Sequence, residues 1–518
     1  MSEWRSTETG QMGDEAPIVP TEARRSSARP SARPVPRARV EKVLDHLLAE
    51  GRLVLIALTA LAFGTVEYWS IGLFSVIVLT LLLVWGAKQV FVDWASPVIP
   101  DLLVPILLWW IFGILQALSW PDSTGQRQSL SLDPESTWQA IEVVALLIGM
   151  GILTANTLDR HGHLRRMALF LTVFGFGLSL FGLLQYFSWN GRYFWLIEPS
   201  VTPSHPFASF VNHNHFAGFV EMIAPIPVAL IVTRAYQREK ALLAAFAAVT
   251  MSVAIFVSLS RGGMISLAAG LMVVFVLGLA RHHRREDEED WESPDDEPVV
   301  GGGRQLSGLP GRVAPLLVPL LLVVAIGTGI LWVAADEVID RVQPGGTPTA
   351  GISSLDRPGE GGSAFYQNRG FIWSDTWRII QAHWGLGVGL GAYATAYSVY
   401  CERDRALLIG QAHNDYLQVL AEGGVIAGVL SLLFLGLLLR SIRRALAHPR
   451  RSRRALALGA TGGITALLVH SVFDFNLQLI SSSFLFLTLS IVVWWIGQSS
   501  FRSNANQLAQ SRGHFRHE

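Results

Sequence analysis

Charge and cysteine are both scarce in this chain of 518 residues. Asp, Glu, Lys and Arg make up 15% of the residues, whereas a typical soluble domain has about a quarter. This shortage excludes an ordinary soluble enzyme and a disordered chain. The one cysteine, Cys401, cannot form a disulfide within the chain, which excludes a disulfide-stapled secreted domain. The formal net charge is zero, so the total says nothing about nucleic acid and only the placement of charge is informative. We expect no nucleic-acid partner.

Several motifs of soluble enzymes are also missing. The sequence has no Walker lysine motif, no Gly-x-Ser-x-Gly and no Asp-x-Asp, so the usual metal-bound clamp for nucleotide sugars is absent. His205, His213 and His215 suggest a metal site, but no Cys or carboxylate pattern completes a coordination shell. We therefore expect these histidines to form hydrogen bonds, and we expect neither a metal nor a cofactor.

Long apolar runs dominate the rest of the chain. Hydrophobic residues make up 51% of it, and a membrane-spanning helix needs about 20 of them in succession. The sequence therefore predicts an all-α polytopic membrane protein with about twelve transmembrane helices. The predicted spans lie near 52–68, 70–88, 100–119, 138–156, 166–188, 215–233, 241–259, 263–280, 313–334, 416–439, 455–473 and 478–497.

Basic residues gather in alternate loops, and this asymmetry orients the spans. The basic loops at 159–167, 233–240, 281–287 and 440–454 are expected inside, together with the basic N-terminal segment. This orientation predicts a disordered cytoplasmic tail at 1–50, a transmembrane domain at 51–500, a cytoplasmic linker at 281–312, one large outer loop at 335–415 and a cytoplasmic tail at 501–518. In the outer loop, Trp373, Trp377, Ile380 and Trp384 recur at helical spacing. They predict a short amphipathic helix that lies on the membrane surface or packs on the bundle.

Ionisable and strongly polar residues cluster at the outer ends of the predicted spans. An ionisable group inside an apolar bundle is costly and is by default a functional candidate. The candidates are His213, Asn214, His215, Arg261, Arg369, His413, Asn414, Asp415, Glu422, His470 and Asp474. Segments far apart in the sequence thus direct polar residues to one face of the membrane.

Each candidate has a structural alternative. Arg261 either reaches to the membrane interface or binds an anion. His470 and Asp474 are four residues apart and share a helix face, as a catalytic or a capping pair. Gly423 and Gly424 interrupt the helix that would place Asp415 and Glu422 on one face, and Gly459 and Gly463 form a small-residue helix contact.

A site on the outer face has no access to ATP or nucleotide sugars, so energy for group transfer must come from a lipid-borne leaving group. Two arginines and a histidine suit a diphosphate leaving group and a hydroxyl nucleophile, because guanidinium groups stabilise phosphate oxygens and imidazole accepts the proton.

Five strings, in this order, resemble the O-antigen ligase / O-antigen polymerase superfamily. They are SLSRGG (258–263), NRGFIWSDTW (368–377), HWGLGVGLGAYATAY (383–397), AHNDYLQVLAEGGVIAG (412–428) and HSVFDFNLQ (470–478). The resemblance covers roughly 200–490. It implies a metal-independent GT-C glycosyltransferase of the bacterial inner membrane, with a periplasmic loop and an active site facing the periplasm.

The resemblance also implies a donor and residue roles. The donor is a glycan on undecaprenyl diphosphate, held at its diphosphate by Arg261 and Arg369, while His413 activates the acceptor hydroxyl. His413, Asn414 and Gly424 nearly satisfy the ligase pattern, but position 427 is Ala, so ligase and polymerase both stay open. The acceptor is a glycan or glycolipid, such as lipid A-core or another lipid-linked repeat, or a protein.

A twelve-span transporter or flippase of lipid-linked glycans is the rival from another class. It predicts two similar six-span halves and polar residues near mid-membrane. Here the long inner loop follows the eighth predicted span, and the polar residues gather at the outer ends of the spans. The sequence therefore favours the transferase hypothesis.

Overall fold

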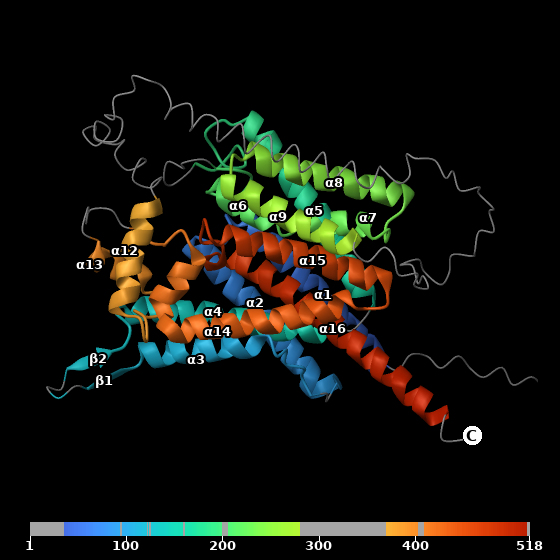
Figure 1. Cartoon of the computed structure of the whole chain (residues 1–518), viewed down its shortest axis with the longest axis horizontal. Helices are drawn as coiled ribbons and strands as arrows, with labels where there is room; N and C mark the ends of the chain where they lie inside the picture. Colours follow the sequence, from blue (N-terminus) through green and yellow to red (C-terminus); the bar gives the residue numbers. More distant parts are fainter. Residues whose placement is uncertain are drawn as a thin grey trace, which may run out of the picture.

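The computed structural model describes residues 36–93, 96–121, 123, 126–158, 161–198, 206–279, 369–401 and 409–514. Most of these residues lie in long helices that run side by side (Figure 1). The helices are α1 (Pro36–Leu61), α2 (Tyr68–Lys88), α3 (Leu103–Ala117), α4 (Pro134–Thr157), α5 (His161–Phe187), α6 (His213–Val220), α7 (Pro225–Val232), α8 (Arg238–Val257), α9 (Arg261–Leu279), α12 (Arg369–Ala382), α13 (Tyr393–Tyr400), α14 (Asp415–Leu446), α15 (Arg451–His470) and α16 (Ile480–His514). A π-helix, η1 (Gln89–Asp93), continues α2, and a 3₁₀ helix, η4 (Asn476–Gln478), precedes α16. An antiparallel hairpin of β1 (Ser119–Pro121) and β2 (Arg127–Ser129) extends from one end of the bundle.

Eight segments within the described residues are long and apolar enough to cross a membrane: α2 with η1, α4, α5, α6 with α7, α8, α9, α14 and α16. They confirm the prediction of a helical, multi-pass membrane protein, whereas the count of twelve stays a prediction. α1, α3 and α15 are helices at three more predicted positions, although α3 has only 15 residues. The predicted span at 313–334, the linker at 281–312 and residues 335–368 of the predicted outer loop lie outside the described residues.

α1 begins at Pro36, which corrects the predicted extent of the N-terminal tail. A disordered segment was expected up to residue 50, but residues 36–50 are helical. Leu48 and Ala49 are buried, and Lys88 of α2 forms an ion pair with Asp45 at 3.1 Å. Packing against α2 therefore extends the helix beyond the apolar run that the sequence reveals. Residues 1–35 lie outside the described part of the chain.

α15 and α16 form the centre of the bundle. α15 packs against α7, α9 and α16, and its glycines allow the backbones to approach closely. A Cβ atom at Gly463 would lie 2.1 Å from the carbonyl oxygen of Met222, and one at Gly459 would lie 2.6 Å from Cα of Ile226. The predicted role of these two glycines in helix packing is confirmed.

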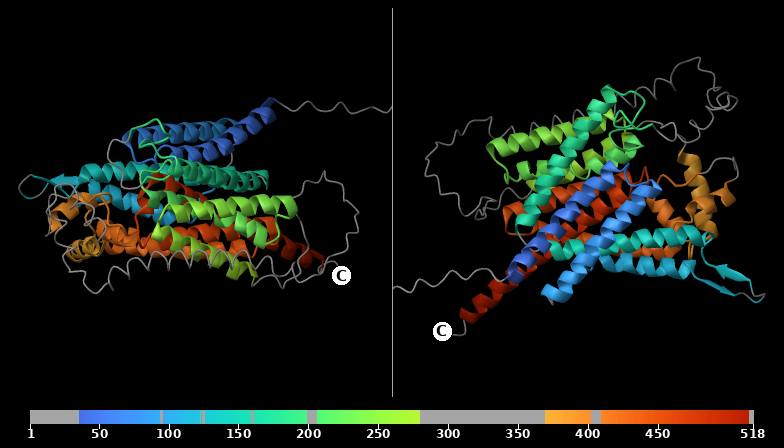
Figure 2. Two further views of the ribbon diagram at one scale, coloured as in Figure 1. Left: turned by 90° about the horizontal axis from the view of Figure 1, so that it is seen from above. Right: turned by 180° about the vertical axis from the view of Figure 1, so that it is seen from behind.

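α12 confirms the short helix predicted after residue 369, but its buried face is not the tryptophan face. α12 crosses one end of the bundle at a steep angle to the long helices (Figures 1 and 2). Ile372, Ile379 and Ile380 are buried in a cluster shared with α13 and α14, whereas Trp377 and Trp384 are exposed. The helix therefore packs on the bundle through its aliphatic residues, and its Trp377 faces outward.

α14 is interrupted at Gly424, as the sequence predicts. This residue has φ 57° and ψ −149°, a conformation accessible to glycine. The break receives the glycine-rich loop before α13: Val425 N–H donates to the Trp384 carbonyl at 2.8 Å, and Gly389 N–H to the Glu422 carbonyl at 3.0 Å. The glycine run thus has a structural role, since it docks a tight loop against a broken helix.

Gly424→Ala should lower the midpoint of thermal unfolding in detergent by several degrees. An added Cβ would lie 2.5 Å from the Gly385 carbonyl oxygen, and alanine is strained at this φ, with a cost of about 1–3 kcal/mol. Gly436→Ala is the matched control on the same helix, because a Cβ there meets no atom within 4 Å. An equal effect of both substitutions would contradict the account of the break.

Candidate functional site

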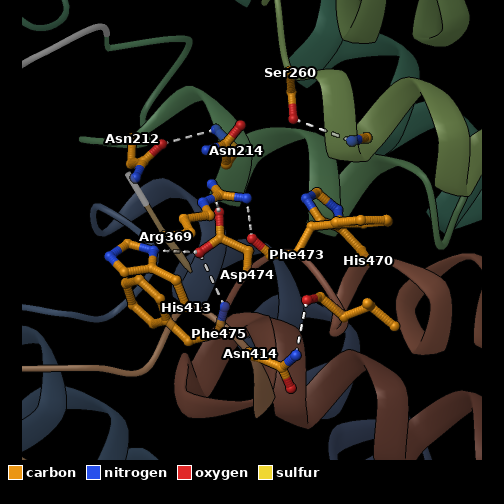
Figure 3. A network of polar contacts seen from close by, with 12 residues as sticks. Asn212, Asn214, Ser260, Arg369, His413, Asn414, His470, Phe473, Asp474 and Phe475 are labelled. Carbon is orange, nitrogen blue, oxygen red and sulfur yellow. Dashed lines mark hydrogen bonds and ion pairs between the residues drawn. The ribbon is translucent and has the colours of Figure 1, made fainter. Parts of the chain in front are cut away.

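Three side chains from distant parts of the sequence meet at the end of the bundle where α12 lies (Figure 3). Asp474, in the segment between α15 and η4, is completely buried. Its Oδ1 atom is 3.2 Å from Nδ1 of His413, and its Oδ2 atom is 3.7 Å from Nη2 of Arg369. Arg369 also donates through Nη1 to the carbonyl of Phe473. The structure therefore joins Arg369, at the start of α12, to His413, which precedes α14.

Asp474 is held as a carboxylate in this cluster. Burial by itself would raise its pKa, but the hydrogen bond from His413 and the nearby positive charges bring the pKa well below its usual range. The backbone N–H of Phe475 also donates to Oδ1 at 2.9 Å. An ionised carboxylate can only accept, so the shared proton is on Nδ1 of His413. The Nε2 atom of His413 is then the nitrogen that can accept a proton.

His413 occupies a strained turn whose two sides are fixed. Its φ is 50°, in the left-handed region that residues other than glycine rarely adopt. On one side, the backbone N–H of Ala412 donates to Oε1 of Gln418 at 3.0 Å. On the other side, Asn414 caps α14 by accepting from the backbone N–H of Leu417 at 3.0 Å. The imidazole is 21% exposed, so it is anchored and still open to a ligand.

Asn414 and Asp415 connect this turn to the segment that carries Asp474. Asn414 Nδ2 donates to the Val472 carbonyl at 3.0 Å, and Asp415 N–H donates to the Ser471 carbonyl at 2.9 Å. Asp415 Oδ2 accepts from Leu477 N–H at 3.1 Å. These bonds fix His413 against Asp474, so the two predicted neighbours of His413 hold the site in shape.

The start of α6 approaches the same cluster through Phe475. The rings of His215 and His413 both make edge contacts with Phe475, with centroids 4.9 Å and 4.8 Å away. Asn212 caps α6 by accepting from Asn214 N–H at 2.9 Å, and His213 is half-buried at its first residue. The predicted residues 213–215 therefore lie at the edge of the cluster, where His215 contacts Phe475. His205 is outside the described residues.

His470 pairs with Glu221 instead of Asp474, which corrects the predicted pair. Nδ1 of His470 is 3.0 Å from each carboxylate oxygen of Glu221, and both side chains are buried. Asp474 lies beyond the end of α15, between Phe473 and Phe475, and the side chains of His413 and Arg369 contact it there. Glu221 was missed, although a lone acid in the apolar run of the sixth predicted span was a detectable signal.

Arg261 is exposed at the first residue of α9, and the next residue, Gly262, contacts the buried ring of His470. A Cβ atom at Gly262 would lie 2.8 Å from Nε2 of His470, so the start of α9 packs directly on that ring. The Glu221–His470 pair thus supports the backbone that carries Arg261. The structure places Arg261 near the cluster through this packing, and places Arg369 in the cluster itself.

A cavity of about 420 Å³ adjoins the cluster, with Phe475 in its wall. Most of its lining residues are apolar, four of them on α4, and Gln411, Gln478 and Glu422 are among its polar groups. Glu422 is buried and accepts from Gln418 Nε2 at 3.0 Å. Glu422 therefore faces this cavity rather than the ion pairs of Asp474. Among the residues that the structure describes, no three His, Cys, Asp or Glu side chains are grouped to hold a metal.

The fold and the cluster define a multi-pass helical membrane protein with a polar site at one end of its bundle. Residues 246–434 match the sequence profile of the O-antigen ligase family. The match confirms the resemblance to this family, whose function is polysaccharide biosynthesis, over these residues. It includes Arg261, Arg369 and His413 and ends before Asp474. No curated protein matches the chain significantly.

Proposed function

We propose that this protein transfers a glycan from undecaprenyl diphosphate to a hydroxyl acceptor at the periplasmic face of the bacterial inner membrane. The observation that carries the proposal is the contact between the Asp474 carboxylate and Nδ1 of His413. A carboxylate that orients an imidazole through Nδ1 directs Nε2 toward a substrate proton, which is the arrangement of a general base.

In the proposed reaction, the acceptor hydroxyl gives its proton to Nε2 of His413 as its oxygen attacks the anomeric carbon of the donor glycan. The bond between that carbon and the diphosphate oxygen breaks, and the lipid diphosphate leaves with the bonding electrons. Attack opposite the leaving group inverts the anomeric centre. Negative charge develops on the departing diphosphate, and cationic groups, not a further base, stabilise it.

Arg369 and Arg261 are the proposed cationic groups. Arg369 is 32% exposed although it contacts Asp474, so its guanidinium has an open side for phosphate oxygens. Arg261 is exposed at the start of α9, and guanidinium groups bind phosphate through two parallel hydrogen bonds. The cavity beside Phe475, with its amide and carboxylate groups, offers space for a sugar unit next to His413.

Arg261→Ala and Arg369→Ala should each raise the donor concentration needed for half-maximal transfer by about 10–100-fold, because charge-assisted hydrogen bonds to the diphosphate are lost. The corresponding lysine variants should recover only part of the loss, since an ammonium group cannot form the bidentate contact. Transfer kinetics with a lipid-diphosphate glycan donor measure both effects.

Arg192→Ala is the matched control for the arginine variants. Arg192 is a partly exposed arginine in the segment between α5 and α6, and its ion pair is with Glu198, outside the cluster. Normal donor dependence in both Arg261→Ala and Arg369→Ala, at normal expression, would contradict the proposed diphosphate contacts.

A further inference from the structure

A second cavity, of about 840 Å³, lies between α5 and α8 at the opposite end of the spans from the polar cluster. α6 and α7 form one span from His213 to Val232, and α8 returns from Arg238 toward the start of α9 at Arg261. The start of α8 is therefore one span away from His213 and Arg261. This cavity is separate from the proposed transfer site.

The cavity is an apolar groove with a closed inner end. Its floor consists of small buried residues, and its walls are large apolar residues that are exposed on the outside of the bundle. The floor is Thr172, Ala244 and Ala247, and the walls are Leu169, Val173, Leu243 and Phe246. The inner end is closed by the rings of Phe176 and Phe246, whose centroids are 5.5 Å apart.

The groove has the length of one leaflet of a bilayer. Arg165 lines the end of the groove at the membrane surface, and Phe176 lines its deep end. The two residues are eleven positions apart on α5, which is about 16 Å at 1.5 Å per residue. The hydrocarbon core of a bilayer is about 30 Å thick, so the groove extends about halfway through it. This depth suits the acyl chain of a phospholipid, whereas the polyprenyl chain of a donor lipid is much longer.

The end of the groove at the start of α8 is positively charged. Arg165, Arg238 and Lys240 line it and are exposed, and Glu239 is the acid among the lining residues. Tyr236, in the loop before α8, lines the same end of the groove as Arg165. Burial raises the pKa of Tyr236, and the charge of Arg165 opposes this shift. Basic residues at the mouth of an apolar groove between membrane helices complement an anionic lipid headgroup.

We propose that this groove binds one anionic phospholipid, with an acyl chain between α5 and α8 and its phosphate at Arg165, Arg238 and Lys240. The site is independent of the proposed glycan transfer. The bound lipid would hold α5 against α8. The stability of the bundle would then depend on the anionic lipid content of the surrounding membrane.

The test compares phosphatidylglycerol with phosphatidylcholine, added to the delipidated full-length protein in detergent. Phosphatidylglycerol should raise the midpoint of thermal unfolding and remain bound in native mass spectrometry. Arg165→Gln with Arg238→Gln should weaken its apparent affinity by about 10–30-fold, because two headgroup charges are lost.

The matched control is Arg166→Gln with Arg234→Gln. Each of these arginines neighbours the proposed site in sequence but does not line the groove, and Arg166 pairs instead with Glu50 at 3.3 Å. The control should retain the affinity for phosphatidylglycerol within about threefold. Ala247→Phe, which fills the floor of the groove without a change of charge, should lose the lipid while the lipid-free unfolding midpoint stays near the wild-type value.

Three results would overturn the proposal. Equal loss of affinity in the two double variants would mean general attraction to a basic surface. Equal stabilisation by inorganic phosphate would mean an anion site that needs no acyl chain. Retention of undecaprenyl phosphate in preference to phosphatidylglycerol would assign the groove to the donor lipid.

Discussion

His413→Ala should reduce glycan transfer by about 10²–10⁴-fold, the usual contribution of a positioned general base. The substitution removes the Nε2 atom that is proposed to accept the hydroxyl proton, and it leaves the proposed arginine contacts to the diphosphate in place. The turnover number should therefore fall, while the donor concentration for half-maximal rate changes little. Steady-state kinetics in proteoliposomes measure the two quantities separately.

His383→Ala is the matched control for this variant. His383 follows α12 at the same end of the bundle, and its Nε2 atom pairs with the Tyr400 hydroxyl at 2.8 Å, outside the cluster. It should keep transfer within a few-fold of the wild-type rate. Wild-type turnover in His413→Ala would contradict the proposed role of His413 as the general base.

Asp474→Asn should lower the turnover number by about 10²-fold or more. Asparagine has nearly the same size, but it carries no charge and can donate to Nδ1, so it no longer fixes the proton on that nitrogen of His413. It also removes the charge that faces Arg369 at 3.7 Å. A loss of turnover with normal folding would distinguish orientation of the base from a purely structural role.

The difference in stability between wild type and this variant should depend on pH in a defined direction. The folded-state pKa of Asp474 is depressed, so its carboxylate stabilises the fold above the unfolded-state pKa of about 3.9 and loses this effect as the pH falls toward the lower folded-state pKa. The difference in unfolding midpoint between wild type and Asp474→Asn should be full at neutral pH and shrink in acid.

Asp133→Asn provides the comparison. Asp133 caps α4 and accepts from Ser136 N–H at 3.1 Å. Burial raises the pKa of Asp133, but this bond and others lower it overall. The control should therefore share the loss of stabilisation in acid but keep normal turnover. If Asp474→Asn also keeps normal turnover, the proposed role of the carboxylate is contradicted.

The sequence predicted those features that depend on local pattern. Long apolar runs identified the membrane helices, tryptophan spacing identified α12, and the glycine pair identified the break at Gly424. These signals are contained in a single segment and need no knowledge of its neighbours.

The partners of the ionisable residues depended on tertiary contacts and could not be predicted in the same way. A separation of four residues suggested that Asp474 faces His470, but α15 ends at His470 and the chain turns there. The Asp474 carboxylate therefore contacts His413 in the turn before α14. Gln116 was also missed, because nothing local shows that α3 passes the glycine loop. Its Nε2 atom donates to the carbonyls of Leu386 and Glu422 at 2.8 Å and 3.0 Å.

The most direct test of the proposed transferase is the fate of the lipid diphosphate in proteoliposomes that contain the purified protein, a lipid-diphosphate glycan and a hydroxyl acceptor. We expect one free lipid diphosphate to be released for each new glycosidic bond, and both products to fall together by about 10²–10⁴-fold in His413→Ala. Movement of the intact donor across the bilayer, without release of lipid diphosphate, would contradict the account and indicate a flippase.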